Sequence, residues 1–461
     1  MAHARPLRPR RHGARASAAA LLLALAGCAA YRPAPLPDSQ LALAPPVAAV
    51  MSTQAEHIDR PWLHPATIDL ARPLDANAIG VLAVLANPDL KAQRAAAGIS
   101  AAQAFAARLL PDPNLSFSYD RLLSGPDSLD NFAGQIAQDI GLLRERKVIA
   151  AAGRAQNRQV RLDIAWAEWQ TAGAARLQAV RVAALETQVT LARSSDTSAR
   201  AMLASSLGAS LRGDIAGDAV QANRLAALDA AERLRAAETA LAAARQELAR
   251  LLGLPPGSRL QLADTAPAVP AELDPARLFA LAERNRTDLA ALRAGYAAQE
   301  AAVHKAVLDQ FPTLQLGFGA SRDTTGNQLL GSSVNFTLPL WNRNRGGIAI
   351  ETATRASLQA AYVARLAQTR ADIAAAIDGI ALARHTASDL QSQIAALSAY
   401  AMGASRAAAH GDLAATTALL ARQSLLDRQS QLSAANQALG EQMIALELLT
   451  GTPISSWNQT S

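Results

Sequence analysis

Two kinds of hydrophobic periodicity follow each other twice along this chain. The first is a period of two: near residues 117, 136, 316 and 336, apolar residues alternate with polar or small ones. Such alternation is typical of a β-strand with one apolar face. The pattern predicts two hairpins, with strands at about 114–121, 132–140, 313–321 and 332–341. The residues expected on the apolar face are Leu115, Phe117, Tyr119, Leu314, Leu316, Phe318, Val334, Phe336 and Leu338.

The second periodicity is helical, and it predicts very long helices after each hairpin. No proline occurs between Pro126 and Pro255, or between Pro339 and Pro453. We predict helices over 143–211 and 215–252 after the first hairpin, and over 343–409 and 413–449 after the second. At 1.5 Å per residue the first would be about 100 Å long. This length is typical of a coiled coil or a helical array. A shorter helix, from Asn87 or Arg286, is predicted before each hairpin.

The two sets of elements form an internal repeat. Pro113 recurs as Pro312, 199 residues later, and a glycine separates the two long helices in each set, at Gly213 and Gly411. We therefore predict a first repeat over residues 76–256 and a second over 274–455. A linker at 257–273 joins them, and a tail at 456–461 follows. In each repeat the strands lie at one end of a rod and the glycine tip at the other.

The predicted strands are long enough to cross a bilayer when tilted. Two hairpins packed on a soluble core are the alternative, but the long helices favour the membrane. Four strands cannot close into a barrel, and an open sheet edge in lipid would leave backbone groups unpaired. We therefore expect the edges to pair with other copies of the chain. Three copies are favoured over two, because a larger barrel leaves a lumen for the small and polar inward side chains.

The N-terminus reads as a targeting segment. Residues 1–27 combine five arginines with an apolar stretch too short to span a bilayer. The stretch ends in Leu-Ala-Gly-Cys, which resembles a bacterial lipoprotein signal. We expect cleavage before Cys28, lipidation of that cysteine, and a proline-rich tether over 28–75 lying on the surface. Ala29 after the lipidated residue favours the outer membrane over the inner one.

Removing this segment changes the charge of the protein. The full chain has a formal net charge of +6, and residues 1–27 hold five arginines and no acid, so the mature chain is close to neutral. A near-neutral chain gives no reason to expect nucleic acid as a partner. The sequence contains no phosphate-binding loop, zinc-spaced histidine pair or nucleophile elbow, so we expect no enzyme activity and no cofactor.

Together these features resemble the TolC-like outer-membrane efflux protein family, over about residues 80–455. The tandem copies, the Pro-x-Leu strand starts and the glycine tips carry the resemblance. It implies a mainly α-helical fold with a transmembrane β part: a homotrimer with a 12-stranded β-barrel continuous with a 12-helix tunnel through the periplasm. It also implies two partners, a periplasmic adaptor (membrane fusion protein) that grips the helical tips and an inner-membrane pump, in addition to outer-membrane lipid.

The resemblance also assigns roles to individual residues. The residues expected to contact the adaptor are Arg212, Gly213, Asp214, Ile215, His410, Gly411, Asp412 and Leu413. Many family members carry two aspartates six and nine residues after the second tip glycine, where this chain has Thr417 and Leu420. A conventional cation-binding gate is therefore in doubt. The entrance charge could come instead from Asp214, Asp218 and Asp412, although tip or helix-start aspartates are also explained by the helix dipole alone.

The segment 338–349, Leu-Pro-Leu-Trp-Asn-Arg-Asn-Arg-Gly-Gly-Ile-Ala, is similar to one found in the heavy-metal (cobalt–zinc–cadmium type) efflux subgroup. This similarity favours divalent metal cations as cargo, although the sequence shows no cluster of metal ligands. Multidrug or protein-secretion ducts are the alternatives within the family. A periplasmic coiled-coil adaptor lipoprotein without a pore is the alternative outside it, but an adaptor has one helical hairpin and this chain has two.

Overall fold

The computed structural model describes residues 31–43, 48–263, 270 and 272–457. The expected signal segment and Cys28 lie outside the described residues. Contacts divide the chain into residues 1–45 and residues 46–461. In the first unit the described part holds one short helix, α2 (Ser39–Ala42). All the other described helices and strands belong to the second unit.

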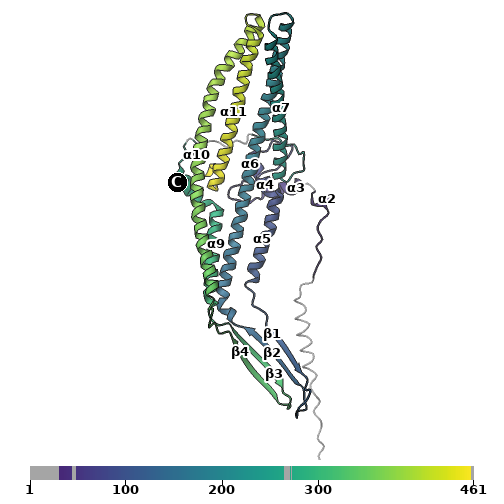
Figure 1. Cartoon of the computed structure of the whole chain (residues 1–461), viewed down its shortest axis with the longest axis vertical. Helices are drawn as coiled ribbons and strands as arrows, with labels where there is room; N and C mark the ends of the chain where they lie inside the picture. Colours follow the sequence, from purple (N-terminus) through teal and green to yellow (C-terminus); the bar gives the residue numbers. More distant parts are fainter. Residues whose placement is uncertain (1–30, 44–47, 264–269, 271, 458–461) are drawn as a thin grey trace, which may run out of the picture. The chain divides into compact units, whose positions relative to one another are not determined.

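The same order of elements occurs twice in the second unit (Figure 1). Each half contains two helices, two strands and two long helices. The first half, which follows α3 (Ala48–Glu56), comprises α4 (Ala76–Ala86), α5 (Pro88–Ala106), β1 (Asn114–Asp120), β2 (Asn131–Asp139), α6 (Gly141–Leu211) and α7 (Gly217–Leu251). The second half comprises α8 (Pro275–Asn285), α9 (Thr287–Leu308), β3 (Leu314–Arg322), β4 (Gln328–Phe336), α10 (Arg345–His410), α11 (Ala415–Thr450) and the 3₁₀ turn η1 (Ile454–Ser456).

Each half begins with two helices where the sequence pattern predicted one. Asn87 ends α4 and starts α5: its backbone is extended, and its side chain accepts a hydrogen bond from Leu90 N at 2.9 Å. Pro88 then occupies the first turn of α5, where its missing N–H leaves no helical hydrogen bond unmade. Asn87 was read as the start of a helix, but the apolar run before it, 76–86, is a helix of its own.

The long helices form a layer in which each packs on its neighbours (Figure 1). Near the sheet the order of contacts is α5, α6, α9 and α10. Toward the tips the order is α7, α6, α11 and α10. Helix α6, of 71 residues, and α10, of 66 residues, run from the sheet to the tips and are about 100 Å long. The sheet lies at one end of these helices and the two tips at the other.

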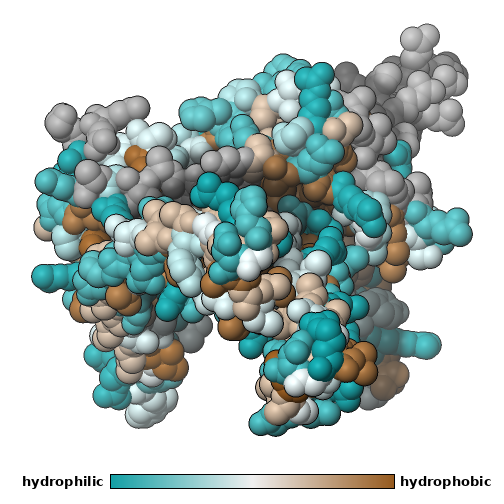
Figure 2. Space-filling view, turned by 90° about the horizontal axis from the view of Figure 1, so that it is seen from above, coloured by the Kyte–Doolittle hydropathy of each residue, from teal (hydrophilic) through white to brown (hydrophobic). Residues whose placement is uncertain are grey.

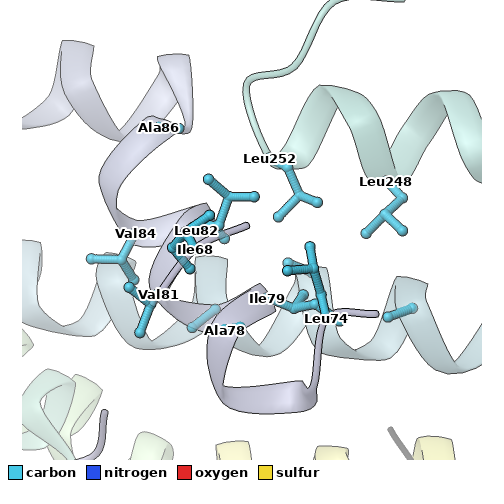
Figure 3. Packing of buried hydrophobic residues seen from close by; sticks show 14 of the residues in the cluster. Ile68, Leu74, Ala78, Ile79, Val81, Leu82, Val84, Ala86, Leu248 and Leu252 are labelled. Atoms are coloured by element: carbon cyan, nitrogen blue, oxygen red, sulfur yellow. The ribbon is translucent and has the colours of Figure 1, made fainter. Parts of the chain in front are cut away.

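The largest hydrophobic core lies where α4 crosses α6 and the end of α7 (Figure 3). Ile79 and Leu82 of α4 and Leu252 after α7 are fully buried there. A buried leucine or isoleucine contributes about 1.5–3 kcal/mol, so this joint anchors the layer. The expected tether is wrong in part, because Ala55 and Leu74 are buried in this core. The sequence did not predict this burial, because the apolar residues of this proline-rich segment follow neither a helical nor a strand period.

The four strands form one antiparallel sheet in the order β1-β2-β3-β4. Three of them lie within a residue of the predicted bounds. The fourth is displaced: β4 ends at Phe336, opposite Leu314, whereas the alternation predicted a strand to 341. Leu338, expected on the strand, therefore lies beyond it. Pro339 is the physical reason, because it has no N–H to donate to a continued ladder with β3.

Candidate functional site

The register of the sheet separates apolar from polar side chains. Leu115 lies opposite Ile136, Ile136 opposite Phe318, and Phe318 opposite Ser332, so these positions share one face. Extending this register, the face carries Leu115, Phe117, Tyr119, Phe132, Ile136, Leu314, Leu316, Phe318, Leu330, Val334 and Phe336. Eight of the nine residues predicted for the apolar face lie on it, and Leu338 is the exception.

These apolar side chains are not covered by the rest of the chain. Phe117, Phe318 and Phe336 are each about 60% exposed. Phe117 packs only loosely on Phe132, with ring centroids 6.5 Å apart. An exposed apolar surface of this extent on a sheet marks a site of contact with lipid or protein.

The opposite face of the sheet is polar and closely packed. Gln135 donates a hydrogen bond to the hydroxyl of Ser333 at 2.6 Å, across the intervening strand β3. Gly317 lies beneath this bond, and a Cβ placed there would approach Gln135 Nε2 to 2.2 Å. Apart from Leu329, the remaining positions on this face are small or polar, such as Ser116, Ser118 and Asn335. This face is therefore suited to water.

Neither edge of the sheet is paired with another strand of the described residues. Along the described part of the chain, β1 pairs only with β2, and β4 only with β3. Each edge therefore presents a row of backbone N–H and C=O groups with no ladder partner. None of the described helices is both long and apolar enough to span a membrane.

At the far end of the helices, two glycine turns reverse the chain (Figure 1). Gly213 and Gly411 have φ of +78° and +83°, in the left-handed region that favours glycine. In both turns the next residue, Asp214 or Asp412, donates its backbone N–H to a helix carbonyl at 2.9 Å, that of Ala209 or Ala407. The two tips thus end α6 and α10 in the same way.

The side chains expected to contact an adaptor differ in their exposure. Arg212 and Asp214 are exposed and form an ion pair at 2.9 Å. His410 and Asp412 are exposed as well. Ile215 and Leu413 are only partly exposed, and Leu413 packs against an alanine cluster between α10 and α11. Viewed from the tip end, hydrophilic and hydrophobic residues are interspersed over the surface (Figure 2).

The acidic residues near the tips do not form a ligand cluster. Asp214 is neutralised by Arg212, and Asp218 lies in the first turn of α7, where the helix dipole favours a carboxylate. Thr417 and Leu420 lie in the first two turns of α11, after Asp412. Among the described residues, no group of three or more His, Cys, Asp or Glu side chains could hold a metal ion.

Replacing Gly411 by alanine should destabilise the second tip by about 1–2 kcal/mol, because a Cβ is strained in the left-handed region. The measurement is the rate of proteolysis at the tip. Gly403→Ala is the matched control: that helical site has no atom within 4 Å of the new Cβ. It should leave the rate unchanged or lower it, since alanine favours a helix. Equal acceleration in both variants would contradict a role for the turn.

Sequence reasoning missed a buried ion cluster where the N-terminal segment meets the helices. Glu168 of α6 is 3% exposed and accepts hydrogen bonds from Arg60 and, at 2.7 Å, from Arg94 of α5. Burial alone would raise the pKa of Glu168, but the two guanidinium groups outweigh it and hold the pKa below its ordinary value. Arg94 lies in the helix that the sequence predicts from Asn87. The spacing gave no sign of its partner on another helix.

A second buried ion pair, between Arg286 and Asp288, lies at the start of α9 in the second half. Arg286 is 4% exposed, donates two hydrogen bonds to Asp288 at 2.9 and 2.7 Å, and stacks over the Trp166 ring at 4.7 Å. Asp163 lies close enough to Asp288 that burial and this like charge raise the pKa of Asp163. Arg293, which corresponds to Arg94 in the second repeat, donates a hydrogen bond to the Tyr362 hydroxyl at 2.9 Å. The two repeats therefore share their backbone plan but not their charge pairs.

Comparison with known proteins adds a family to this geometry. Residues 278–452 match the family described as outer membrane efflux protein. No curated protein matches the sequence.

Solved structures share the fold at low identity. A crystal structure of CusC, described in connection with transmembrane channel formation, is 18% identical, with a TM-score of 0.67 over 85% of this chain and 97% of that one. The outer membrane protein VceC of Vibrio cholerae is 17% identical, with a TM-score of 0.67 over 82% and 96%. The CmeC outer membrane channel of Campylobacter jejuni is 14% identical, with a TM-score of 0.68 over 92% and 94%.

Proposed function

We propose that this chain, whose residues 278–452 match the outer membrane efflux protein family, is the outer-membrane channel of a tripartite export system. The observation that carries the proposal is the sheet. It has one exposed apolar face, one polar face and two unpaired edges. We infer that the apolar face lies against the lipid bilayer, that the polar face lies against water, and that the two edges pair with further copies of the chain.

Three copies suit these faces best. Two copies would give eight strands, a barrel filled by its own side chains, whereas twelve strands leave a lumen. The polar face, with Ser116, Ser118 and Asn335, would line that lumen. The helical layers of three copies would continue it as a 12-helix tunnel through the periplasm. Such a conduit is passive and needs no catalytic residue.

The tips are the proposed contact with the periplasmic adaptor, which links the channel to an inner-membrane pump. Arg212, His410 and Asp412 are available to it, since their side chains are exposed. Ile215 and Leu413 would contribute mainly by fixing the turn. At the other end of the chain, lipidation of Cys28 would anchor the protein in the outer membrane.

Function is tested first by assembly and conduction. The mature protein, purified in detergent, should have the mass of three chains and should form conducting pores in planar bilayers. A protein that stays monomeric and water-soluble would contradict the proposal and support an adaptor instead.

Divalent metal cations are the proposed cargo, on the similarity of residues 338–349 to the heavy-metal subgroup. The structure supplies a local role for part of this segment. Asn344, with φ of +50°, donates a hydrogen bond from its side chain to the carbonyl of Ala306 at 2.8 Å, which ties α10 to α9. A Cβ at Gly347 would lie 2.4 Å from the side-chain oxygen of Asn344, so the glycine makes room for this contact.

Cargo is tested by deleting the gene and comparing tolerance of divalent metals with tolerance of lipophilic drugs, with the pump expressed and no redundant channel present. We expect sensitivity to metals to rise and drug tolerance to stay unchanged. Loss of drug tolerance alone would assign a multidrug channel. Loss of secretion of a protein, with both tolerances intact, would assign a protein duct.

Asp412→Asn is expected to lower the cation selectivity of the pore. In a trimer this exposed carboxylate would occur three times at the periplasmic entrance. Such a ring of negative charges at the entrance of a pore favours cations. The reversal potential in a salt gradient measures the change. Asp214→Asn is the control, since Arg212 already neutralises Asp214, and it should change the potential less. An equal shift in both variants would contradict this assignment.

A further inference from the structure

We propose that β4 of one copy pairs with β1 of the next in a single register, in which Phe336 lies opposite Tyr119 and Thr337 opposite Ser118. The inference rests on the proposed function, because it specifies how the barrel closes. Two observations on the sheet restrict the possible registers to every second one, and a third selects one of these.

The first observation is the sorting of the two faces. On β4 the apolar face holds even-numbered residues such as Val334 and Phe336, and on β1 it holds odd-numbered residues such as Phe117 and Tyr119. A continuous apolar face around the barrel therefore requires even residues of β4 to lie opposite odd residues of β1. A slip of one residue would turn every apolar side chain of the seam toward the lumen.

The second observation is the direction of the backbone hydrogen bonds. Ile140 donates its N–H to the carbonyl of Leu314 at 2.9 Å, which identifies this pair as a hydrogen-bonded one. Hydrogen-bonded and non-bonded pairs alternate along an antiparallel ladder. This one pair, together with the register, therefore determines which residue pairs are hydrogen-bonded in all three ladders of the sheet. Odd residues of β1 and even residues of β4 then direct their N–H and C=O groups to the free edges. These are the residues that the faces also bring together.

Pro339 agrees with this assignment. As an odd-numbered residue after β4, its nitrogen lies on the side of β3 and not on the free edge. It therefore ends the ladder with β3 while leaving the outer edge able to bond.

The third observation is the repeat, which selects one register among those that the first two allow. Ile136 and Phe336 are equivalent, since they lie opposite Leu115 and Leu314. Phe318 and Tyr119 are equivalent too, four residues after Leu314 and Leu115. Within the chain, Ile136 of β2 lies opposite Phe318 of β3. The same junction between copies places Phe336 opposite Tyr119.

This register gives β4 two more residues in the assembly. Thr337 and Leu338 lie beyond the strand in the single chain, and Leu338 is 61% exposed. Opposite Ser118 and Phe117 of the next copy, they would continue the ladder. Leu340 donates its N–H to the carbonyl of Leu338 at 2.9 Å, and this tight turn ends the extension.

Disulfide formation tests the register directly. Thr337 and Ser118 would form a non-bonded pair, with Cα atoms about 4.5 Å apart, within the range of a disulfide. In one chain the residue that lies across the sheet from Ser118 is Leu329, three strand spacings or about 14 Å away, and Thr337 comes eight residues after it. Any disulfide must therefore join two copies. The variants are Thr337→Cys with Ser118→Cys, and, for registers shifted by two, Thr337→Cys with Ser116→Cys or with Asp120→Cys. Single-cysteine variants control for links through Cys28.

We expect mild oxidation in membranes to convert most Thr337→Cys/Ser118→Cys chains into linked dimers and trimers, and to leave the two shifted pairs largely unlinked. Asn335→Cys with Asp120→Cys, the next pair in the same register, should link as well and guards against one variant failing to fold. Faster linking of a shifted pair would overturn the register. If the protein has the mass of a trimer but no cysteine pair forms a link, the proposed pairing of β4 with β1 alone would be wrong. If the protein has the mass of a monomer, the proposed function would be wrong as well.

Discussion

Replacing Glu168 by alanine is expected to lower the free energy of unfolding by about 3 kcal/mol, the lower end of the effect of removing one partner from a buried ion pair, because Arg60 and Arg94 are 39% and 30% exposed. Glu168 is 3% exposed, and its loss would leave Arg60 and Arg94 facing each other without a counter-charge. The attachment of residues 48–75 to α6 should weaken as a result, because Arg60 forms an ion pair with Glu168. Urea unfolding of the detergent-solubilised protein, followed by helical circular dichroism, measures the change.

Glu238→Ala is the matched control for this experiment. Glu238 also pairs with an arginine, Arg193, at 2.8 Å, but both side chains are about half exposed or more. Exposed pairs contribute about 0–1 kcal/mol, so this variant should be close to the parent protein. Similar losses in the two variants would contradict the importance of burial.

The effect of Glu168 should also depend on pH. The folded-state pKa of Glu168 lies below its ordinary value, so the stabilisation is complete above the unfolded pKa, about 4.3, and is lost as the pH falls through the folded pKa. The difference in stability between the parent protein and Glu168→Ala should therefore be constant near pH 7 and should shrink below about pH 4. A difference that grows in acid would contradict the ion cluster.

Replacing Gly253 by alanine is the second change with a large expected effect. Gly253 has φ of +61°, and a Cβ there would lie 2.3 Å from the carbonyl oxygen of Ala86, at the end of α4. This contact is with backbone, so α4 or the end of α7 must move, and the core around Ile79 and Leu252 would open. We expect the free energy of unfolding to fall by more than about 1–2 kcal/mol, which is the cost of left-handed backbone strain alone.

Gly257→Ala separates strain from contact. Gly257 also has a left-handed φ, +82°, but no atom lies within 4 Å of its Cβ position. It should therefore show the strain alone. Thermal unfolding of both variants provides the comparison, and equal shifts in the melting temperature would show that the close approach to α4 is unimportant.

The sequence was most informative where one physical rule decided the outcome. Alternation placed Phe117 and Phe318 on one face of the sheet, because strand geometry fixes the sides. The lack of proline from 127 to 254 allowed α6 and α7, and the glycines at 213 and 411 marked the turns between long helices. These features are local, so the residues concerned are sufficient to predict them.

Other features depended on partners far away in the chain. Alternation through Leu338 and Leu340 suggested a longer fourth strand, but the end of β4 is set by Pro339 and the pairing with β3. The irregular apolar residues of the N-terminal segment, such as Leu74, are buried only because α4 and α7 meet there. Glu168 and Arg94 lie on different helices, and their contact follows from the packing of α5 on α6, which no spacing predicts.

The central claim is that the apolar face of the sheet lies in lipid and the polar face lines water. Thiol labelling in intact outer membranes tests it most directly, with single-cysteine variants on each face of the two edge strands. A water-soluble, membrane-impermeant maleimide should modify Ser118→Cys and Asn335→Cys and should leave Phe117→Cys and Phe336→Cys unmodified, while a lipid-soluble probe should show the reverse. Ready modification of Phe117→Cys and Phe336→Cys from water would contradict the account.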